Sequence, residues 1–309
     1  MLTEKQLTYF LAIAGAGSFR RAAEAIHIAQ PALSRHMRLL EQELGVQLFF
    51  RRPTGISLTD AGELLLERGQ YLNRLRDQAY ADVAAKGTVP TGRVGLGAPP
   101  SVANILFRPL ATNYLKQHRG VQLSLFEGVG HLQRWLASGE IDLAIIGKGT
   151  SSEFGDFKRK ELLTEPILLV AAKGVLGDKT ALPPEDLLKL PLIITPAPST
   201  VRTLLDKLSV RTGVAPRVVV ETQSVHAQAD LVAAGLGYAL LPHSAITDDQ
   251  RANTLSTQRI DGWSLHRSLA WRSDIPLTAA VSMMIEQVIS QMHSLARAGA
   301  FGTDAEFTL

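Results

Sequence analysis

Residues 18–52 read SFRRAAEAIHIAQPALSRHMRLLEQELGVQLFFRR, and this stretch decides the architecture of the N-terminal part of the chain. Ser18 suits the N-cap of a helix. The predicted buried face of that helix carries small and apolar residues at helical spacing: Phe19, Ala22, Ala23 and Ile26. A turn over residues 27–30 follows, and Pro31 suits the first position of a second helix, where no amide donor is needed. The stretch therefore predicts a helix-turn-helix.

Another helix is predicted before this pair. Thr3 and Gln6 form a capping-box pattern at its start. Gly15-Ala16-Gly17 marks its end. The N-terminal module is therefore expected to contain three helices.

The helix that begins at Pro31 has two chemically different faces. Its predicted buried face carries Leu33, Met37, Leu40 and Leu44, and Gly45 ends it. The opposite face near its start carries Gln30, Ser34, Arg35 and Arg38. Gln and Arg side chains make paired hydrogen bonds to base edges in the major groove. The predicted DNA-binding residues are Arg20, Gln30, Pro31, Ser34, Arg35, Arg38, Arg51 and Arg52.

A short hairpin is predicted after this helix, over residues 48–58. Arg51 and Arg52, followed by Pro53-Thr54-Gly55, suit a wing that lies over a phosphate backbone. Residues 1–58 contain seven basic and four acidic residues, so they hold the whole net charge of +3. The alternative is a three-helix module that binds protein and carries a solvated Arg pair.

Composition limits the remaining possibilities. A chain of 309 residues predicts two or three domains. The absence of cysteine excludes disulfides and thiolate metal sites. No apolar run is long enough to span a bilayer, and the first residues do not form a secretory signal. These observations predict a cytoplasmic protein with no membrane partner.

The first 65 residues resemble the signature of the LysR-type transcriptional regulators. The matching residues include Ala22-Ala23, Gln30-Pro31-Ala32-Leu33-Ser34-Arg35, Leu40-Glu41, Leu44-Gly45, Leu48-Phe49, Arg51, Leu58-Thr59 and Ala61-Gly62. The resemblance implies an α/β multidomain fold. Its parts are an N-terminal winged helix-turn-helix, a long linker helix, and a C-terminal two-lobed α/β effector domain similar to periplasmic binding proteins.

The segment 59–91 is expected to be a dimerisation linker and hinge. Thr59 suits the cap of a long helix that reaches about Lys86. Leu58, Leu65, Leu72 and Ala79 recur every seven residues, with Ala61, Leu75 and Val83 beside them. This pattern predicts a seam with a second chain; the alternative is a helix packed on its own domain. Residues 87–92 are rich in Gly and Thr and predict the hinge.

Residues 92–309 alternate predicted strands and helices, which indicates a largely parallel α/β sheet. We expect lobe I at about 92–163 and 268–300, and lobe II at about 164–267. The chain would cross between the lobes near residues 163–166 and 265–269. Such a topology places a ligand between the lobes, at the carboxyl ends of strands. No role is predicted for the tail 299–309.

Several predicted helix starts in this domain suit an anion, because their amides and hydroxyls lack partners inside the helix. Together with the resemblance, which adds Gly147, they give these expected effector-binding residues: Pro100, Ser101, Gly128, Val129, Gly147, Ser199, Thr200, Arg202, Ser224 and Val225. The predicted effector is a small organic anion. No cofactor, metal or catalytic residue is expected.

These expectations combine into one function. The chain is expected to bind an interrupted palindrome in double-stranded DNA as a homodimer or homotetramer, under control of the effector, with RNA polymerase as a further partner. The alternative is an enzyme or a transport-type binding protein on the same two-lobed fold. The eight histidines show no zinc-type spacing, and the two Gly-x-Gly pairs lack the rest of a dinucleotide fingerprint.

Overall fold

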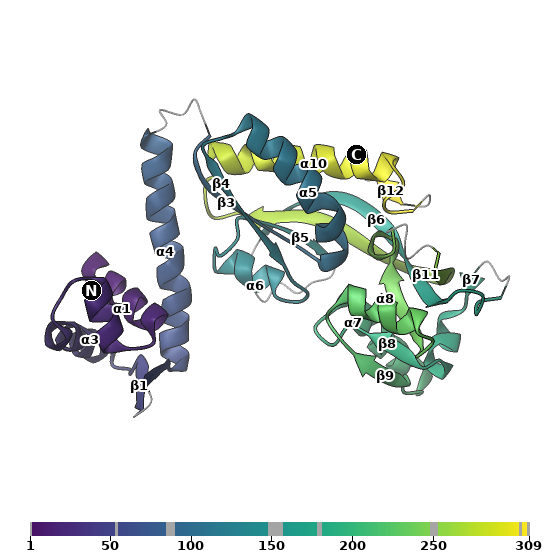
Figure 1. Ribbon diagram of the computed structural model, residues 1–309, viewed down its shortest axis with the longest axis horizontal. Helices are drawn as coiled ribbons and strands as arrows, with labels where there is room; N and C mark the ends of the chain where they lie inside the picture. Colours follow the sequence, from purple (N-terminus) through teal and green to yellow (C-terminus); the bar gives the residue numbers. More distant parts are fainter. Residues whose placement is uncertain are drawn as a thin grey trace. The chain divides into compact units, whose positions relative to one another are not determined.

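A computed structural model describes residues 2–52, 55–84, 90–147, 157–177, 181–247, 253–302 and 305–307. The chain divides into two compact units, Met1–Tyr80 and Ala81–Leu309. Figure 1 labels most of the helices and strands of both units. The first unit includes most of the long helix that follows residue 58. The domain bounds at residues 58 and 91 stay predictions.

The first unit is a winged helix-turn-helix. It contains α1 (Glu4–Ala16), α2 (Phe19–Ala25), α3 (Gln30–Leu44), the antiparallel strands β1 (Phe49–Arg52) and β2 (Gly55–Leu58), and α4 (Asp60–Ala84). Phe10, Ile13, Leu33, Met37 and Leu40 are fully buried in its core. The hairpin tip at residues 53–54 lies outside the described residues.

The predicted caps of the first helices are largely confirmed. The Thr3 hydroxyl accepts a hydrogen bond from the Gln6 amide at 3.2 Å, and the Gln6 side chain accepts one from the Thr3 amide at 2.8 Å. Gly17 and Gly45 end α1 and α3 in the left-handed conformation, as their lack of a Cβ allows. The Ser18 prediction is only partly right, because its side chain makes no capping hydrogen bond.

One predicted core residue of α3 is wrong. Leu44 is 45% exposed, whereas Leu40 one turn earlier is fully buried. The reason is that the last turn of α3 extends past the core that this helix forms with α1 and α2. The helix also begins at Gln30 rather than after it, so Gln30 belongs to the first turn.

The long helix α4 is fastened to the first unit by two glycines seven residues apart. A Cβ at Gly62 would lie 2.1 Å from the Leu48 carbonyl oxygen, and one at Gly69 would lie 2.5 Å from Leu7 Cδ1. Arg76 and Glu4 add an exposed ion pair at 2.7 Å. Glycine is required at Gly62, where the neighbour is backbone, whereas at Gly69 the neighbour is the end of a leucine side chain, which can shift.

The predicted heptad seam is therefore divided. Leu58, Ala61 and Leu65 pack on the core of their own unit, which was the alternative interpretation for this helix. Leu72 is 48% exposed and Val83 is 81% exposed, and Ala79 is also exposed. The seam prediction is thus wrong for the first two turns of the helix. The predicted end near Lys86 and the residues 87–89 of the hinge lie outside the described residues.

The second unit is built on one mixed sheet. Its elements are β3 (Gly92–Ala98), α5 (Pro100–Gln117), β4 (Val121–Glu127), α6 (Leu132–Ala137), β5 (Leu143–Gly147), β6 (Phe157–Ala172), β7 (Ala181–Leu182), η2 (Pro184–Lys189), β8 (Leu192–Ile194), α7 (Thr200–Thr212), β9 (Val218–Glu221), α8 (Val225–Ala233), β10 (Tyr238–Pro242), η3 (His243–Ala245), β11 (Leu255–Arg272), α10 (Ala279–Arg297) and β12 (Glu306–Phe307). The main strand order is β4-β3-β5-β11-β6-β10-β8-β9.

Two parallel groups of strands occupy the ends of this sheet. Strands β4, β3 and β5 run parallel in lobe I, and β10, β8 and β9 run parallel in lobe II. Strands β6 and β11 pair antiparallel with each other and extend through both lobes. Their pairing shifts register between Arg259 and Ser264 and between Arg267 and Ser268. The sheet is thus continuous where the chain crosses between lobes.

Lobe I has helices on both faces of its strands. Figure 1 shows α5 and α10 together on one face and α6 on the other. The fully buried Tyr114 of α5 joins the two helices, because its hydroxyl donates to the Ala280 carbonyl at 2.7 Å. Burial raises the pKa of Tyr114 to about 12. The phenol is therefore neutral at ordinary pH.

Part of the C-terminal tail has a structural role that the sequence did not predict. Phe301 is fully buried in the core of lobe I. Glu306 and Phe307 form β12, which pairs with Thr164 and Leu163 of β6. The tail therefore lies beside the segment of β6 that crosses between the lobes.

The packing at Gly62 gives a direct test of the α4 attachment. Gly62→Ala should destabilise the first unit by about 1–3 kcal/mol, because the new methyl group meets a backbone carbonyl that cannot move aside. Gly15→Ala is the matched control: it lies in α1 with open space around it, and should stabilise the helix by about 0.5–1 kcal/mol. Chemical denaturation measures both; equal effects at the two positions would contradict this packing.

The wing depends on one carboxylate. Glu41 Oε1 of α3 accepts from the Leu48 amide at 2.9 Å and from the Phe49 amide at 3.4 Å. Glu41→Ala should therefore destabilise the first unit by about 1–3 kcal/mol, since it leaves two part-buried amides without an acceptor. Glu41→Gln keeps an acceptor oxygen and should lose less. A similar melting temperature for the alanine variant and the unchanged protein would exclude this role.

Candidate DNA interface and effector site

Helix α3 keeps its polar edge outside the core. Gln30, Pro31, Arg35 and Arg38 are exposed and Ser34 is half-buried. The opposite edge of the same helix is fully buried at Leu33, Met37 and Leu40. The helical period therefore places the predicted base-reading side chains together on one accessible edge.

The charge of this edge is not neutralised within its own unit. Arg35 and Arg38 make no ion pair among the described residues, and Arg38 Nε makes only a 3.5 Å contact to the Ser34 carbonyl. Arg20 of α2 differs, because it pairs with Glu24 at 3.5 Å, with both side chains largely exposed. The two free guanidinium groups thus remain available to an acceptor outside the chain.

His36 does not belong to the polar edge. Its ring packs edge-on against the Tyr9 ring of α1, with 5.2 Å between centroids. His36 thus contributes to the contact between α1 and α3. The backbones of Arg51 and Arg52 lie in β1, opposite Ile56 and Gly55. Their side chains lie outside the described residues.

In the second unit, the predicted effector residues follow strand ends in both lobes. Pro100 and Ser101 begin α5 after β3, Gly128 and Val129 follow β4, and Gly147 ends β5. In lobe II, Ser199 and Thr200 begin α7 after β8, and Ser224 and Val225 begin α8 after β9. The carboxyl ends of parallel strands therefore carry these residues in each lobe.

The structure brings some of them together across the two lobes. A Cβ at Gly147 of lobe I would lie 3.2 Å from Thr200 Oγ1 of lobe II. A Cβ at Gly130 would lie 2.6 Å from the Pro198 carbonyl oxygen. These two contacts define the lobe seam, the place where the strand ends of lobe I meet the start of α7.

Two hydroxyls at the predicted site are engaged in helix caps. Ser199 Oγ accepts from the Arg202 amide at 3.1 Å, and Ser224 Oγ accepts from the Ala227 amide at 3.2 Å. Val225 is 7% exposed and packs in an apolar cluster of lobe II. Its side chain therefore belongs to the core of lobe II. The expected role of Val225 at the start of α8 stays a prediction.

Arg202, one of the predicted effector-binding residues, makes two ion pairs within lobe II. Its Nε donates to Asp206 Oδ1 at 2.8 Å, and its Nη1 pairs with Glu221. The hydrogen bond to Asp206, together with Glu221, raises the pKa of Arg202 above its ordinary value. Two carboxylates thus surround the guanidinium, so it is not a free positive charge for an anion.

A different arginine, which the sequence did not predict as a site residue, lies buried beside the start of α5. Arg267 of β11 and Glu165 of β6 form an ion pair at 2.5 Å with side-chain exposures of 6% and 0%. Arg267 Nη2 also donates to the Ser101 hydroxyl at 3.3 Å, and Glu165 Oε2 accepts from the Ser244 amide at 3.3 Å. This buried cluster of Arg267, Glu165, Ser101 and Ser244 joins both crossing strands to α5 and η3.

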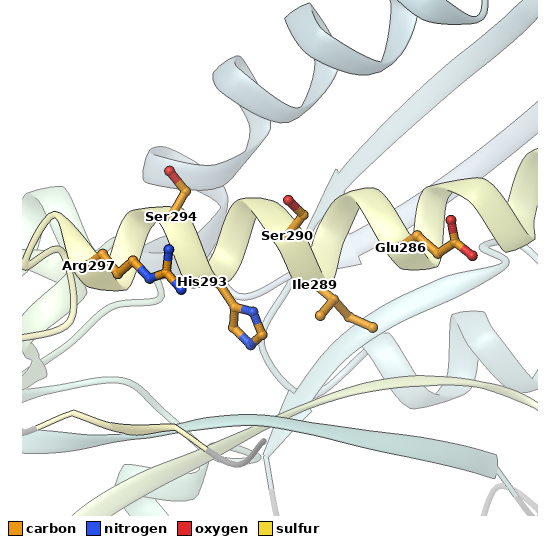
Figure 2. Close-up of a pocket in the computed structure, with 6 residues that line it drawn as sticks. All are labelled: Glu286, Ile289, Ser290, His293, Ser294 and Arg297. Atoms are coloured by element: carbon orange, nitrogen blue, oxygen red, sulfur yellow. The ribbon is translucent and has the colours of Figure 1, made fainter.

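A separate hollow of about 530 Å³ lies along α10. Figure 2 shows its lining side chains, all from that helix: Glu286, Ile289, Ser290, His293, Ser294 and Arg297. Ser290 and Ser294 point to the opposite side of the helix from Ile289 and His293 (Figure 2). None of the predicted effector residues lines this hollow, so it is distinct from the lobe seam.

Two features are absent from the described part of the chain. No helix in it is both long and apolar enough to cross a membrane. No group of three or more His, Asp or Glu side chains in it is placed to hold a metal ion.

Comparison with known proteins places both units in one family. Residues 5–63 match the bacterial regulatory helix-turn-helix protein, lysR family, and residues 87–293 match the LysR substrate binding domain. The nitrogen assimilation regulatory protein nac of Escherichia coli is 29% identical over 300 residues, covering 93% of this chain and 95% of the relative. The probable RuBisCO transcriptional regulator of Gracilaria tenuistipitata var. liui is 28% identical, covering 87% and 89%.

Solved structures show the same fold. A full-length OxyR variant from Pseudomonas aeruginosa superposes with a TM-score of 0.68 at 24% identity, covering 95% of each chain. CbnR, a LysR family transcriptional regulator, superposes with a TM-score of 0.65 at 22% identity, covering 94% of this chain and 99% of that one. These matches favour a regulator over the enzyme and transport alternatives. The chain belongs to the LysR family of transcriptional regulators.

Proposed function

We propose that this regulator reads double-stranded DNA with the polar edge of α3 and responds to a small organic anion at the lobe seam. The observation that carries the first half is the division of α3 into a fully buried apolar edge and an exposed edge with unpaired arginines. Leading residues of such a helix contact base edges in the major groove. The proposed contacts are Gln30, Ser34, Arg35 and Arg38, with Pro31 at the helix start.

Phosphate contacts would come from basic residues around this edge. We assign them to Arg20, Arg51 and Arg52, which lie on α2 and the wing strand β1. Such contacts fix the position of a protein on DNA and make its affinity depend on salt. The protein would act in the cytoplasm, where bacterial DNA and RNA polymerase are found.

We further propose that α4 forms the dimer. Leu72, Ala79 and Val83 are exposed and lie on the same face of the helix as Leu65, which packs on its own unit. That face therefore continues beyond the core that covers its first half. A second copy of α4 would cover it, and two such dimers would give the tetramer. In this arrangement residues 1–58 read DNA, 59–91 link the chains, and 92–309 bind the effector.

The effector half of the proposal rests on the meeting of strand ends at the lobe seam. Ser101, Ser199 and Thr200 carry hydroxyls there, Gly128 and Gly147 lie at the strand ends, and Pro100 begins α5. A ligand shifts the equilibrium between two arrangements of the protein only if it binds them unequally. Binding between two lobes meets this condition, because it depends on how far apart the lobes stand.

The DNA assignment is tested by Arg35→Ala on the full chain, with a duplex that the unchanged protein enriches from a random-sequence pool. Losing one base contact should weaken binding to that duplex by about 1–3 kcal/mol and relax the preference at one base pair. Arg108→Ala, at an exposed site on α5, is the matched control and should leave the affinity unchanged. Equal affinities for the two variants would refute the role of α3.

The dimer assignment is tested by Leu72→Glu, which places a charge on the exposed face of α4. It should shift the protein toward monomer in sedimentation analysis, because a buried unpaired carboxylate opposes association. Val175 is exposed to a similar extent as Leu72 but lies outside α4, so Val175→Glu should leave the oligomer unchanged. An unaltered oligomeric state of the Leu72 variant would show that this face does not join the chains.

A further inference from the structure

We propose that Arg267 is the cationic group that binds a carboxylate of the effector, together with the backbone amide and hydroxyl of Ser101 at the start of α5. This inference rests on the proposed effector function and names its ligand class and its charged residue. Arg267 takes the charged role that the sequence predicted for Arg202, because Arg202 is paired with Asp206 and Glu221.

The orientation of the Arg267 guanidinium is fixed by Glu165. Arg267 Nε donates to Glu165 Oε1 at 2.7 Å, and Nη2 contacts the same oxygen at 2.5 Å. The other carboxylate oxygen of Glu165 accepts from the Ser244 amide. Glu165 therefore uses the side of the guanidinium that carries Nε. The terminal side, with Nη1 and the second hydrogen of Nη2, is directed elsewhere.

Donors without a protein acceptor remain on that terminal side. Among the described residues Nη1 of Arg267 makes no hydrogen bond, although the whole residue is only 5% exposed. Nη2 contacts the hydroxyl of Ser101, which is 4% exposed and keeps its own hydrogen to donate. The two hydrogens of Nη1 therefore remain for an acceptor outside the protein, and Nη1 is not among the buried side-chain atoms that lack a partner.

The start of α5 supplies further donors at the same place. Ser101 follows Pro100, which has no amide hydrogen, and the Pro99 carbonyl accepts only from Val102 and Ala103. The Ser101 amide lies in the first turn of an 18-residue helix and makes no hydrogen bond among the described residues. The positive end of the helix dipole therefore lies beside the guanidinium and favours an anion.

The cluster lies at the lobe seam. Arg267 pairs in register with Gly147, the last residue of β5. A Cβ on Gly147 would in turn lie 3.2 Å from Thr200 Oγ1 at the start of α7. Arg267 thus stands one strand away from the point where the two lobes meet, at the carboxyl ends of the parallel strands of lobe I.

A carboxylate fits these donors better than other groups. One of its oxygens can accept from Nη1 of Arg267 and the other from the Ser101 hydroxyl, because the second hydrogen of Nη2 is already donated to Ser101. A cation would meet only donors. The charges of Arg267 and Glu165 cancel each other, so the attraction for a further anion comes from the positive end of α5 and from the N–H donors of Nη1. The same contacts would connect the ligand to Glu165 and Ser244, on the strand and turn that lead into lobe II.

The experiment uses the full-length protein and sodium acetate, benzoate and succinate as probes, with sodium chloride at equal ionic strength as the reference. Binding is measured from the rise in melting temperature with salt concentration. At least one carboxylate should raise the melting temperature of the unchanged protein above the chloride reference. The double variant Arg267→Met with Glu165→Gln removes both charges together and should abolish that rise.

Two other variants make the result specific. Arg267→Lys keeps the positive charge but loses the planar guanidinium, in which the contact of Nε with Glu165 fixes the position of Nη1. It should therefore weaken carboxylate binding at least about tenfold. It also serves if the double variant does not fold. Arg202→Met should bind each carboxylate within about twofold of the unchanged protein. A double or lysine variant that keeps full carboxylate affinity, or no rise with any of the three carboxylates, would overturn the proposal.

Failure of this inference is separable from failure of the proposed function. The Arg267 variants should bind the enriched DNA duplex as tightly as the unchanged protein, because α3 is untouched. Intact DNA binding with undiminished carboxylate affinity would remove Arg267 alone. If the unchanged protein shows no sequence-specific DNA binding, the proposed function is refuted, and the carboxylate result still holds.

Discussion

The pairing of β6 with β11 is the constraint on which the second unit depends. Each strand begins in one lobe and ends in the other, so the two lobes share backbone hydrogen bonds instead of a flexible linker. Any change in the angle between the lobes must bend this pair. Its two register shifts, near Arg259–Ser264 and at Arg267–Ser268, are where the ladder is already interrupted. Pro166, which has no amide hydrogen, lies opposite Ser264 beside the first shift.

In the first unit, the same helix serves the fold and the proposed recognition of DNA. The buried edge of α3 holds α1 and α2, and its Glu41 holds the wing. Because both edges belong to one rigid helix, the core determines the position of the polar edge. The close approach of α4 at Gly62 and Gly69 extends this rigidity into the helix that is proposed to join two chains.

The sequence predicted the parts of the structure that depend on local chemistry. The capping box at Thr3, the glycine stops at Gly17 and Gly45, and the alternation of strands and helices all follow from neighbouring residues. It failed where a distant contact decides the outcome. The exposure of Leu44 depends on where α1 and α2 stop covering α3, and the division of the α4 seam depends on packing against Leu7 and Leu48.

The proposed effector site shows the same limit. Helix starts at Ser101 and Ser199 could be read from the sequence, and so could the (i, i+4) partner Asp206 of Arg202. The second partner, Glu221, could not be read, because it lies on β9. The Arg267–Glu165 pair could not be read from the sequence either. Strands β6 and β11 each carry several charged residues, so no single charge in them marks a buried partner.

Stability alone does not account for that buried pair. Removing two charges from water costs about as much as their attraction returns, and apolar residues of similar size are often equally stable in such positions. Losing one partner is different, since it leaves a buried charge uncompensated and costs about 3–5 kcal/mol. The pair therefore adds little to the free energy of folding, yet neither residue can be replaced alone without a large loss of stability. Glu165 orients the guanidinium of Arg267 toward the start of α5, on the strands that both lobes share. The proposed role in ligand binding gives a reason for this pair that packing does not give.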